Sequence, residues 1–343
     1  MKFAILGLLS MIPASAAEYS ARRVDIDGLE VVQLADAARH IEVSIAPSVG
    51  NIVYEIKVNG NNILWAPFHS PAELKSSPRF SAIPFLAPWA NRLEDDTYWV
   101  NGKEYALNTK LGNVRRDNHQ KPIHGLIYFS PDWKLESVSA DTRSAWTTSR
   151  LDFWKHPDLM AQFPFAHSIT ITYRLANGEF QVETTIDNLS TDPLPVAIGY
   201  HPYFQLDDAP RDQWKVHLPA REHVILNNLL IPTGEHKPSE FADTFSLRGV
   251  QLDDVFTGLV RGADGLAQFW VEGKKQKVTV TYGPKYQVAV VYAPPGRDFI
   301  CFEPMAAVTN AFNLAHSGLY KHLQSIPPGG QWKESFWITP SGF

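Results

Sequence analysis

The strongest constraint on the fold is a pair of alternating segments joined by an Asn-Gly dipeptide. Apolar residues alternate with mostly polar ones over residues 169–175 and again over 180–186, and Asn177-Gly178 lies between the two segments. A period of two is typical of a β-strand with one buried face. Asn-Gly favours the left-handed backbone of a two-residue hairpin turn. The sequence therefore predicts a β-hairpin over residues 169–186.

Similar strand signals recur along the chain and predict an all-β protein. Four more strands are predicted, the first two of them followed by an Asn-Gly pair, over residues 52–58, 98–100, 278–282 and 288–292. Few segments carry the apolar stripe of an amphipathic helix. The direct prediction is therefore an all-β sandwich.

No linker divides the chain after residue 17, so we expect residues 18–343 to form a single domain. Large β folds commonly reach this length as one unit. Two stretches that mix proline with polar and charged residues, 71–79 and 232–240, are short enough to be surface loops.

The first seventeen residues have the three parts of a secretory signal peptide. Lys2 precedes an apolar run over residues 3–12, and small residues follow at Ala14-Ser15-Ala16. The run is shorter than the roughly 20 residues that a helix needs to span a bilayer. We therefore predict that residues 1–17 are removed and that the protein is periplasmic or extracellular; the alternative is a first buried strand.

Composition excludes several classes of partner. The formal net charge is -5 and no long basic run occurs, which argues against nucleic-acid binding. No later apolar segment is long enough to cross a membrane. Cys301 is the single cysteine, so no internal disulfide is possible, and its apolar neighbours predict an inert thiol in a buried strand. Asn188-Leu189-Ser190 matches a glycosylation sequon.

Five short motifs carry the residue types of a catalytic site. In chain order they are Asn91-Arg92, His124-Gly125, Gly199-Tyr200-His201-Pro202-Tyr203-Phe204, Leu252-Asp253-Asp254-Val255-Phe256 and Phe302-Glu303-Pro304-Met305. Glu303 lies among apolar residues, where a carboxylate needs a reason to be buried, and catalysis supplies one. The alternatives are a strand-end salt bridge for Glu303 and a structural role for His201.

These motifs, in this order, resemble those of the aldose 1-epimerase (galactose mutarotase) family, in which a His-Pro-Tyr-Phe segment carries the catalytic histidine. The resemblance implies a large antiparallel β supersandwich. It also implies that the α and β anomers of a free aldose are interconverted, with a small sugar as the ligand and with neither a metal nor an organic cofactor.

The chemistry of ring opening explains the two central residue types. One group must remove the proton of the C1 hydroxyl while another delivers a proton to the ring oxygen. A carboxylate is ionised near neutral pH and a histidine titrates close to it. We therefore assign Glu303 as base and His201 as acid, with the roles exchanged when the ring closes.

The other motif residues are expected to bind the hydroxyl groups of the sugar. Asp253 accepts hydrogen bonds and Arg92 donates them from a rigid fork, while Asn91 and His124 complete the predicted substrate-binding set by resemblance. A shift of one residue would exchange Asp253 and Asp254.

Three of these assignments have open alternatives. Arg92 could instead pair on the surface with Glu94 or Asp95, and His124-Gly125 could be a simple turn. Whether Gln287 contributes to the site is left open.

The chain departs from the family pattern after two motifs. Acidic residues 94–96 replace a usual glycine after Asn91-Arg92, and Leu126 replaces a second glycine after His124-Gly125. These changes bear mainly on substrate preference.

Two other functions remain open. A sugar-phosphate epimerase of the same fold would need a basic cluster, to which Arg115-Arg116 could contribute, although a solvated loop pair is favoured. A non-catalytic carbohydrate-binding protein would not need both Glu303 and His201. The sequence has no His-Glu-x-x-His metal motif, no Gly-x-Ser-x-Gly elbow and no phosphate-binding loop.

Overall fold

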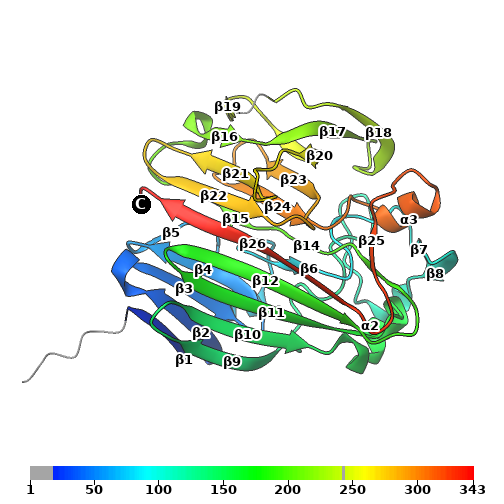
Figure 1. Cartoon of the computed structure of the whole chain (residues 1–343), viewed down its shortest axis with the longest axis horizontal. Helices are drawn as coiled ribbons and strands as arrows, with labels where there is room; N and C mark the ends of the chain where they lie inside the picture. Colours follow the sequence, from blue (N-terminus) through cyan, green and yellow to red (C-terminus); the bar gives the residue numbers. More distant parts are fainter. Residues whose placement is uncertain (1–17, 242–243) are drawn as a thin grey trace, which may run out of the picture.

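Antiparallel β-sheets form nearly all of the regular structure (Figure 1). The computed structural model describes residues 18–241 and 244–343, so the predicted signal peptide lies outside the described residues. Within these ranges the largest sheet has nine strands, in the spatial order β19 (Thr244–Ser246), β16 (Lys215–His217), β21 (Ala267–Glu272), β22 (Lys277–Tyr282), β26 (Gln331–Ser341), β12 (Glu179–Asn188), β11 (His167–Ala176), β10 (Ala145–Leu151) and β9 (Lys134–Ala140).

A second large sheet supplies the strands of the candidate site. Among the described residues it has eight strands, in the order β18 (Pro232–Pro238), β17 (Ala220–Leu226), β20 (Leu252–Leu259), β23 (Val288–Ala293), β24 (Ile300–Met305), β14 (Gly199–Tyr200) and β6 (Phe85–Leu86), with β15 (Tyr203–Phe204) also paired to β24.

A third sheet contains the first strands of the described chain. Its order is β1 (Tyr19–Ile26), β2 (Leu29–Asp36), β3 (Ile41–Ala46), β4 (Ile52–Val58) and β5 (Asn61–Asn62). β1 and β2 contact β9, β10 and β11 of the nine-stranded sheet, so the two sheets pack together, with the third sheet in blue behind the green strands in Figure 1.

The remaining elements are short. Two small ladders pair β7 (Thr97–Val100) with β8 (Lys103–Ala106) and β13 (Leu194–Val196) with β25 (Gln324–Ile326). The α-helices are α1 (Pro71–Ser76), α2 (Pro157–Gln162) and α3 (Ala311–His316), and single 3-10 turns cover Ala37–Arg39, Thr109–Leu111, Phe153–Lys155 and Arg211–Gln213. No helix in the described part of the chain is long and apolar enough to cross a membrane.

The predicted hairpins are confirmed. β11 and β12 pair in register on both sides of Asn177 and Gly178, whose φ angles of 53° and 79° are left-handed. β4–β5 and β7–β8 likewise turn at Asn-Gly pairs with positive φ. The separately predicted strands correspond to β22 and β23.

Two segments predicted as loops contain regular structure instead. Ser70 caps α1, since its side chain accepts a hydrogen bond from the Glu73 N–H, and Pro71 occupies the first turn, where its missing N–H costs nothing. β18 is an exposed edge strand that begins and ends with proline, which edge strands tolerate. Proline does not by itself indicate a loop, because the first turn of a helix and an edge strand both tolerate its missing N–H.

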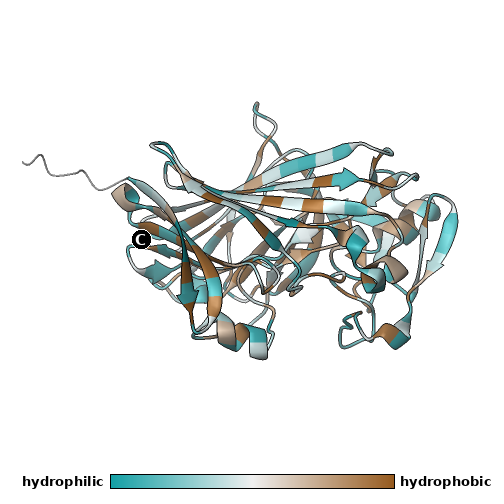
Figure 2. Cartoon of the chain, turned by 90° about the horizontal axis from the view of Figure 1, so that it is seen from below, coloured by the Kyte–Doolittle hydropathy of each residue, from teal (hydrophilic) through white to brown (hydrophobic). Residues whose placement is uncertain are grey.

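The two faces of the eight-stranded sheet have different functions. Hydrophilic and hydrophobic residues alternate along several strands (Figure 2). Successive side chains of a strand point to opposite faces of the sheet, and residues paired across strands share a face. Phe204, Val291 and Phe302 belong to the main hydrophobic core. Their chain neighbours Tyr203, Tyr292 and Cys301 form a separate small cluster on the other face. That second face carries the candidate site.

Two minor predictions concern buried residues. Cys301 is fully buried and unpaired in β24, as expected. Asn188 matches a glycosylation sequon, but its side chain is 1% exposed and its Nδ2 donates to the carbonyls of Asp192 and Ile326. In the folded protein Asn188 is therefore a structural residue.

Candidate active site

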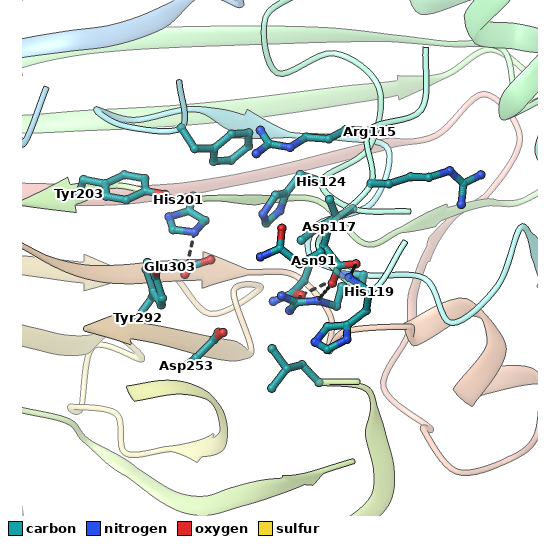
Figure 3. Close-up of a pocket in the computed structure, with 16 residues that line it drawn as sticks. Asn91, Arg115, Asp117, His119, His124, His201, Tyr203, Asp253, Tyr292 and Glu303 are labelled. Carbon is teal, nitrogen blue, oxygen red and sulfur yellow. Dashed lines mark hydrogen bonds and ion pairs between the residues drawn. The ribbon is translucent and has the colours of Figure 1, made fainter. Parts of the chain in front are cut away.

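A cavity of about 400 Å³ opens on the second face of the eight-stranded sheet (Figure 3). Its walls come from β20, β23, β24, the β14–β15 segment and the loops around residues 91 and 115–124. All six residues assigned from the sequence line it: Asn91, Arg92, His124, His201, Asp253 and Glu303. They come from five motifs spread over more than 200 residues, and only the folded chain brings them together.

Strand register places His201 opposite Glu303. Gly199 pairs with Met305 and Tyr203 pairs with Cys301, so the residues midway between them face each other. The His201 Nε2 lies 3.3 Å from the Glu303 Oε1. Gly199 permits this approach, because a Cβ there would lie 2.1 Å from the Met305 sulfur.

The His201 ring is held by aromatic neighbours and not by side-chain hydrogen bonds on both nitrogens. It stacks on Tyr203 at 4.6 Å with an interplanar angle of 9°, and it meets the His124 ring edge-on at 5.5 Å. The His201 Nδ1 and the Glu303 Oε2 have no hydrogen-bond partner within the described ranges. Buried polar atoms without partners cost stability, and in native proteins they often mark functional sites.

Burial shifts both members of the pair towards their neutral forms. It raises the pKa of Glu303 well above the ordinary value, and the nearby Asp253 carboxylate raises it further against the opposing effect of Arg92. Burial also lowers the pKa of His201, and the charges of Arg115 and Arg92 act in the same direction. Burial therefore disfavours the ionised Glu303 that is expected of a solvated carboxylate. Both shifts favour a pair in which Glu303 carries the proton and the His201 imidazole is the basic site.

The structure separates Asp253 from Asp254. The Asp253 side chain lines the cavity, next to its cross-strand partner Tyr292. Asp254 points to the opposite face, where its Oδ1 lies 2.9 Å from the His223 Nε2. Burial raises the pKa of Asp253, although the positive charge of Arg92 opposes this shift. The choice of Asp253 over Asp254 as the cavity residue agrees with this geometry.

Arg92 is fixed by two oxygen atoms. Its Nε donates to the Asp117 Oδ2 at 2.7 Å and its Nη1 donates to the Asn91 Oδ1 at 3.0 Å. The arginine and aspartate side chains are only 12% and 8% exposed. Burial alone would raise the pKa of Asp117, but hydrogen bonds from Arg92 and backbone N–H groups hold it below the ordinary value. Arg92 therefore pairs inside the cavity and not with Glu94 or Asp95.

The His124-Gly125 motif forms a tight turn against the neighbouring chain. Both residues have left-handed φ angles, 64° and 69°, and a Cβ at Gly125 would lie 2.1 Å from the Ala87 carbonyl oxygen. The His124 ring stacks on Phe80 at 4.7 Å and is buried, which lowers its pKa well below the ordinary value. The motif is thus both a turn and part of the cavity wall.

Several cavity residues were not identified from the sequence. Phe80 and Asp117 carry no local signal, because their roles depend on contacts with Arg115, His124 and Arg92. Tyr203 and Tyr292 could have been found, since one lies in the His-Pro-Tyr-Phe segment and the other in a predicted strand.

Gln287 and possible metal ligands were also considered as parts of the site. Gln287 does not line this cavity but a separate one. Within residues 18–241 and 244–343, no group of three or more histidine, cysteine, aspartate or glutamate side chains is arranged to hold a metal ion.

Comparison with known proteins identifies the family. The model of the aldose 1-epimerase family matches residues 30–339, which is most of the chain. The chain belongs to the aldose 1-epimerase family. Human galactose mutarotase is 26% identical over 272 residues, covering 74% of this chain and 72% of the human protein. YihR of Escherichia coli K12, itself an uncharacterized protein, is 25% identical over 252 residues, covering 71% and 75% of the two chains.

Solved structures confirm the predicted mutarotase-type β fold. A galactose mutarotase-like protein from Clostridium acetobutylicum superimposes with a TM-score of 0.84 at 20% identity, covering 95% of this family member and 99% of that chain. A galactose 1-epimerase from Lactobacillus acidophilus gives a TM-score of 0.74 at 14% identity, covering 96% and 100%. At these identities the likeness concerns the fold alone.

Proposed function

We propose that this protein is an aldose 1-epimerase that interconverts the α and β anomers of a free aldose. The observation that carries the proposal is the His201–Glu303 pair, 3.3 Å apart in a cavity of about 400 Å³ lined by hydrogen-bonding side chains. A group that accepts one proton and a group that supplies another are the two requirements of anomeric ring opening.

Ring opening follows from a transfer of protons through the pair. Ionised Glu303 removes the proton of the C1 hydroxyl, the bond between C1 and the ring oxygen breaks, and protonated His201 gives its proton to that oxygen. The product is the open-chain aldehyde, with both protein groups now neutral. Rotation about the C1–C2 bond presents the other face of the aldehyde, and the reverse transfers close the ring.

Ring opening returns both protein groups to their neutral forms. Burial penalises the ionised carboxylate and the imidazolium, and the transfers that open the ring convert both into neutral groups. Hydroxyl groups of the bound sugar would stabilise the ionised starting form by donating to the carboxylate. The cost of forming the ionised pair in the buried cavity is therefore recovered when the ring opens, and no proton has to be exchanged with solvent.

Orientation of the sugar is assigned to Arg92 and Asp253, with His124 and Asn91 beside them. Arg92 is rigid because Asp117 and Asn91 occupy its Nε and Nη1, which leaves Nη2 for a hydroxyl group. Asp253 supplies acceptors from another wall of the cavity. Holding the ring between these groups keeps both proton transfers in line.

A second candidate is a phosphorylated aldose, because Arg115 lines the cavity. Its guanidinium lies 4.3 Å from the Phe80 ring centroid, and no described carboxylate forms an ion pair with it. Arg116 is less available, since its Nη2 contacts Asp96 at 2.7 Å. One unpaired arginine is a weaker phosphate site than a cluster, so the free aldose remains the proposal.

Polarimetry or NMR of freshly dissolved α-glucose and α-galactose tests the reaction directly. Acceleration above the buffer rate supports the proposal. Saturable sugar binding without acceleration would overturn it in favour of a carbohydrate-binding protein. Parallel assays with glucose 6-phosphate, on the native protein and on Arg115→Gln, test the second candidate: a preference for the phosphate ester that Arg115→Gln abolishes would replace the free aldose by a sugar phosphate.

A further inference from the structure

A buried histidine lies behind the cavity, between two carboxylates. His223 on β17 is 8% exposed, and its Nδ1 and Nε2 each lie 2.9 Å from an acidic oxygen, on Glu240 and Asp254 respectively. Lys237 in turn contacts Glu240 at 3.1 Å. His223 does not line the cavity, so the proposed chemistry gives it no role.

Asp254 connects this histidine to the predicted sugar-binding aspartate. Its Oδ1 contacts the His223 ring, while its Oδ2 accepts a hydrogen bond from the Asp253 N–H at 3.1 Å. Since adjacent residues of a strand face opposite sides, Asp254 is anchored on one face of the sheet as Asp253 reaches into the cavity on the other. The Asp254 carboxylate thus joins the His223 ring to the backbone N–H of Asp253, whose strand is also paired with β23.

We propose that His223 is a positioning residue for sugar binding: its imidazolium holds Asp254, and Asp254 holds Asp253 in the cavity. The inference rests on the proposed function, in which Asp253 accepts hydrogen bonds from sugar hydroxyls. It adds a residue that acts through another residue and does not touch the substrate.

Charge supports the same role. Burial raises the pKa of Asp253 against the opposing charge of Arg92, and the Asp254 carboxylate raises it further, which disfavours the ionised acceptor form. A positive His223 offsets that charge. The hydrogen bond to Asp254 raises the pKa of His223, against burial and together with Glu240. The groups facing the ring are thus Asp254 from β20 and Glu240 beyond β18, and Lys237 from β18 acts only on Glu240.

The sign of the pH dependence follows. A histidine whose pKa is raised in the folded state stabilises the fold as long as it is protonated. This stabilisation is complete below the unfolded pKa and is lost as the pH rises through the folded pKa. Sugar binding should therefore weaken as the pH rises through the raised pKa of folded His223, and kcat should change little.

His223→Gln tests the proposal, with His236→Gln as its matched control. His236 on the adjacent strand β18 also contacts a glutamate, Glu222, at 3.0 Å, but has no link to Asp253. We expect His223→Gln to raise KM by about tenfold, the scale of one charge-assisted hydrogen bond, with kcat within about twofold. His223→Gln should also abolish the rise of KM with pH. His236→Gln should leave KM and its pH dependence unchanged.

If His223 had a structural role alone, His223→Gln would lower Tm without changing the pH profile of KM. That result would overturn the proposal. If His223→Gln does not fold, Asp254→Asn retains the histidine and should raise KM in the same way; an unchanged KM in that variant would also refute the link.

NMR titration of the His223 ring in the sugar-free protein tests the positive charge that the positioning role requires. A pKa above the ordinary value of about 6.5 is expected, and one at or below it would contradict the positioning role whatever the enzymatic result. A wild-type protein without mutarotase activity would instead refute the proposed function; Asp253-dependent sugar binding, measured by calorimetry on the same variants, would still test the role of His223.

Discussion

Replacing Glu303 with glutamine should separate activity from stability. The amide has nearly the shape of the carboxyl and remains beside the His201 Nε2, 3.3 Å away in the native protein. It cannot accept the C1 proton. Loss of one general base lowers turnover by about two to four powers of ten, which corresponds to about 2.7–5.5 kcal/mol in the barrier. KM should stay within about threefold, because the contacts of Arg92 and Asp253 with the sugar remain.

Although turnover falls, the thermal stability of Glu303→Gln should not fall at neutral pH. Burial raises the folded-state pKa of Glu303, so its contribution to stability is present below the unfolded pKa and is lost as the pH rises through the folded pKa. Glutamine cannot ionise in the unfolded chain and removes this loss. At neutral and alkaline pH the Tm of Glu303→Gln should equal or exceed that of the native protein, and the difference should vanish in acid.

NMR saturation transfer between anomers and thermal denaturation over a pH series measure the two effects. Glu334→Gln is the matched control, because Glu334 is also buried, lies in the nine-stranded sheet and accepts the N–H groups of Lys285 and Ser335. That variant should keep its activity. Near-native turnover in Glu303→Gln would refute the assigned base, and a Tm that falls at neutral pH would refute the electrostatic reasoning.

Three further predictions address the other assignments. His201→Asn should lower kcat by about two to four powers of ten with the fold intact by circular dichroism, and near-native turnover would remove it from the mechanism. Arg92→Ala and Asp253→Ala should act largely through KM, since they remove hydroxyl contacts and not proton-transfer groups; steady-state kinetics that match the native protein would leave either residue with a structural role only. Export predicts that protein from the producing cell begins near Glu18, which N-terminal sequencing or intact mass would show, and recovery of uncleaved cytoplasmic protein would contradict it.

The sequence by itself determined the elements whose signals are local. The β11–β12 hairpin followed from a period of two and an Asn-Gly turn, because both depend on neighbouring residues only. Motif order was enough to select the family and six of the residues that line the cavity. Proline misled the prediction at α1 and β18, where its meaning depends on whether it begins a helix or lies at a sheet edge.

Tertiary structure decided the relations among those residues. The 3.3 Å contact of His201 with Glu303 joins positions about a hundred residues apart, and no local pattern encodes such a distance. The Asp117 contact that fixes Arg92, and the His223 contact that fixes Asp254, depend on the same long-range pairing. The protonation of the two groups also depends on tertiary structure. The sequence supplies a carboxyl and an imidazole, but burial in the folded chain raises the pKa of Glu303 and lowers that of His201, which favours both neutral forms.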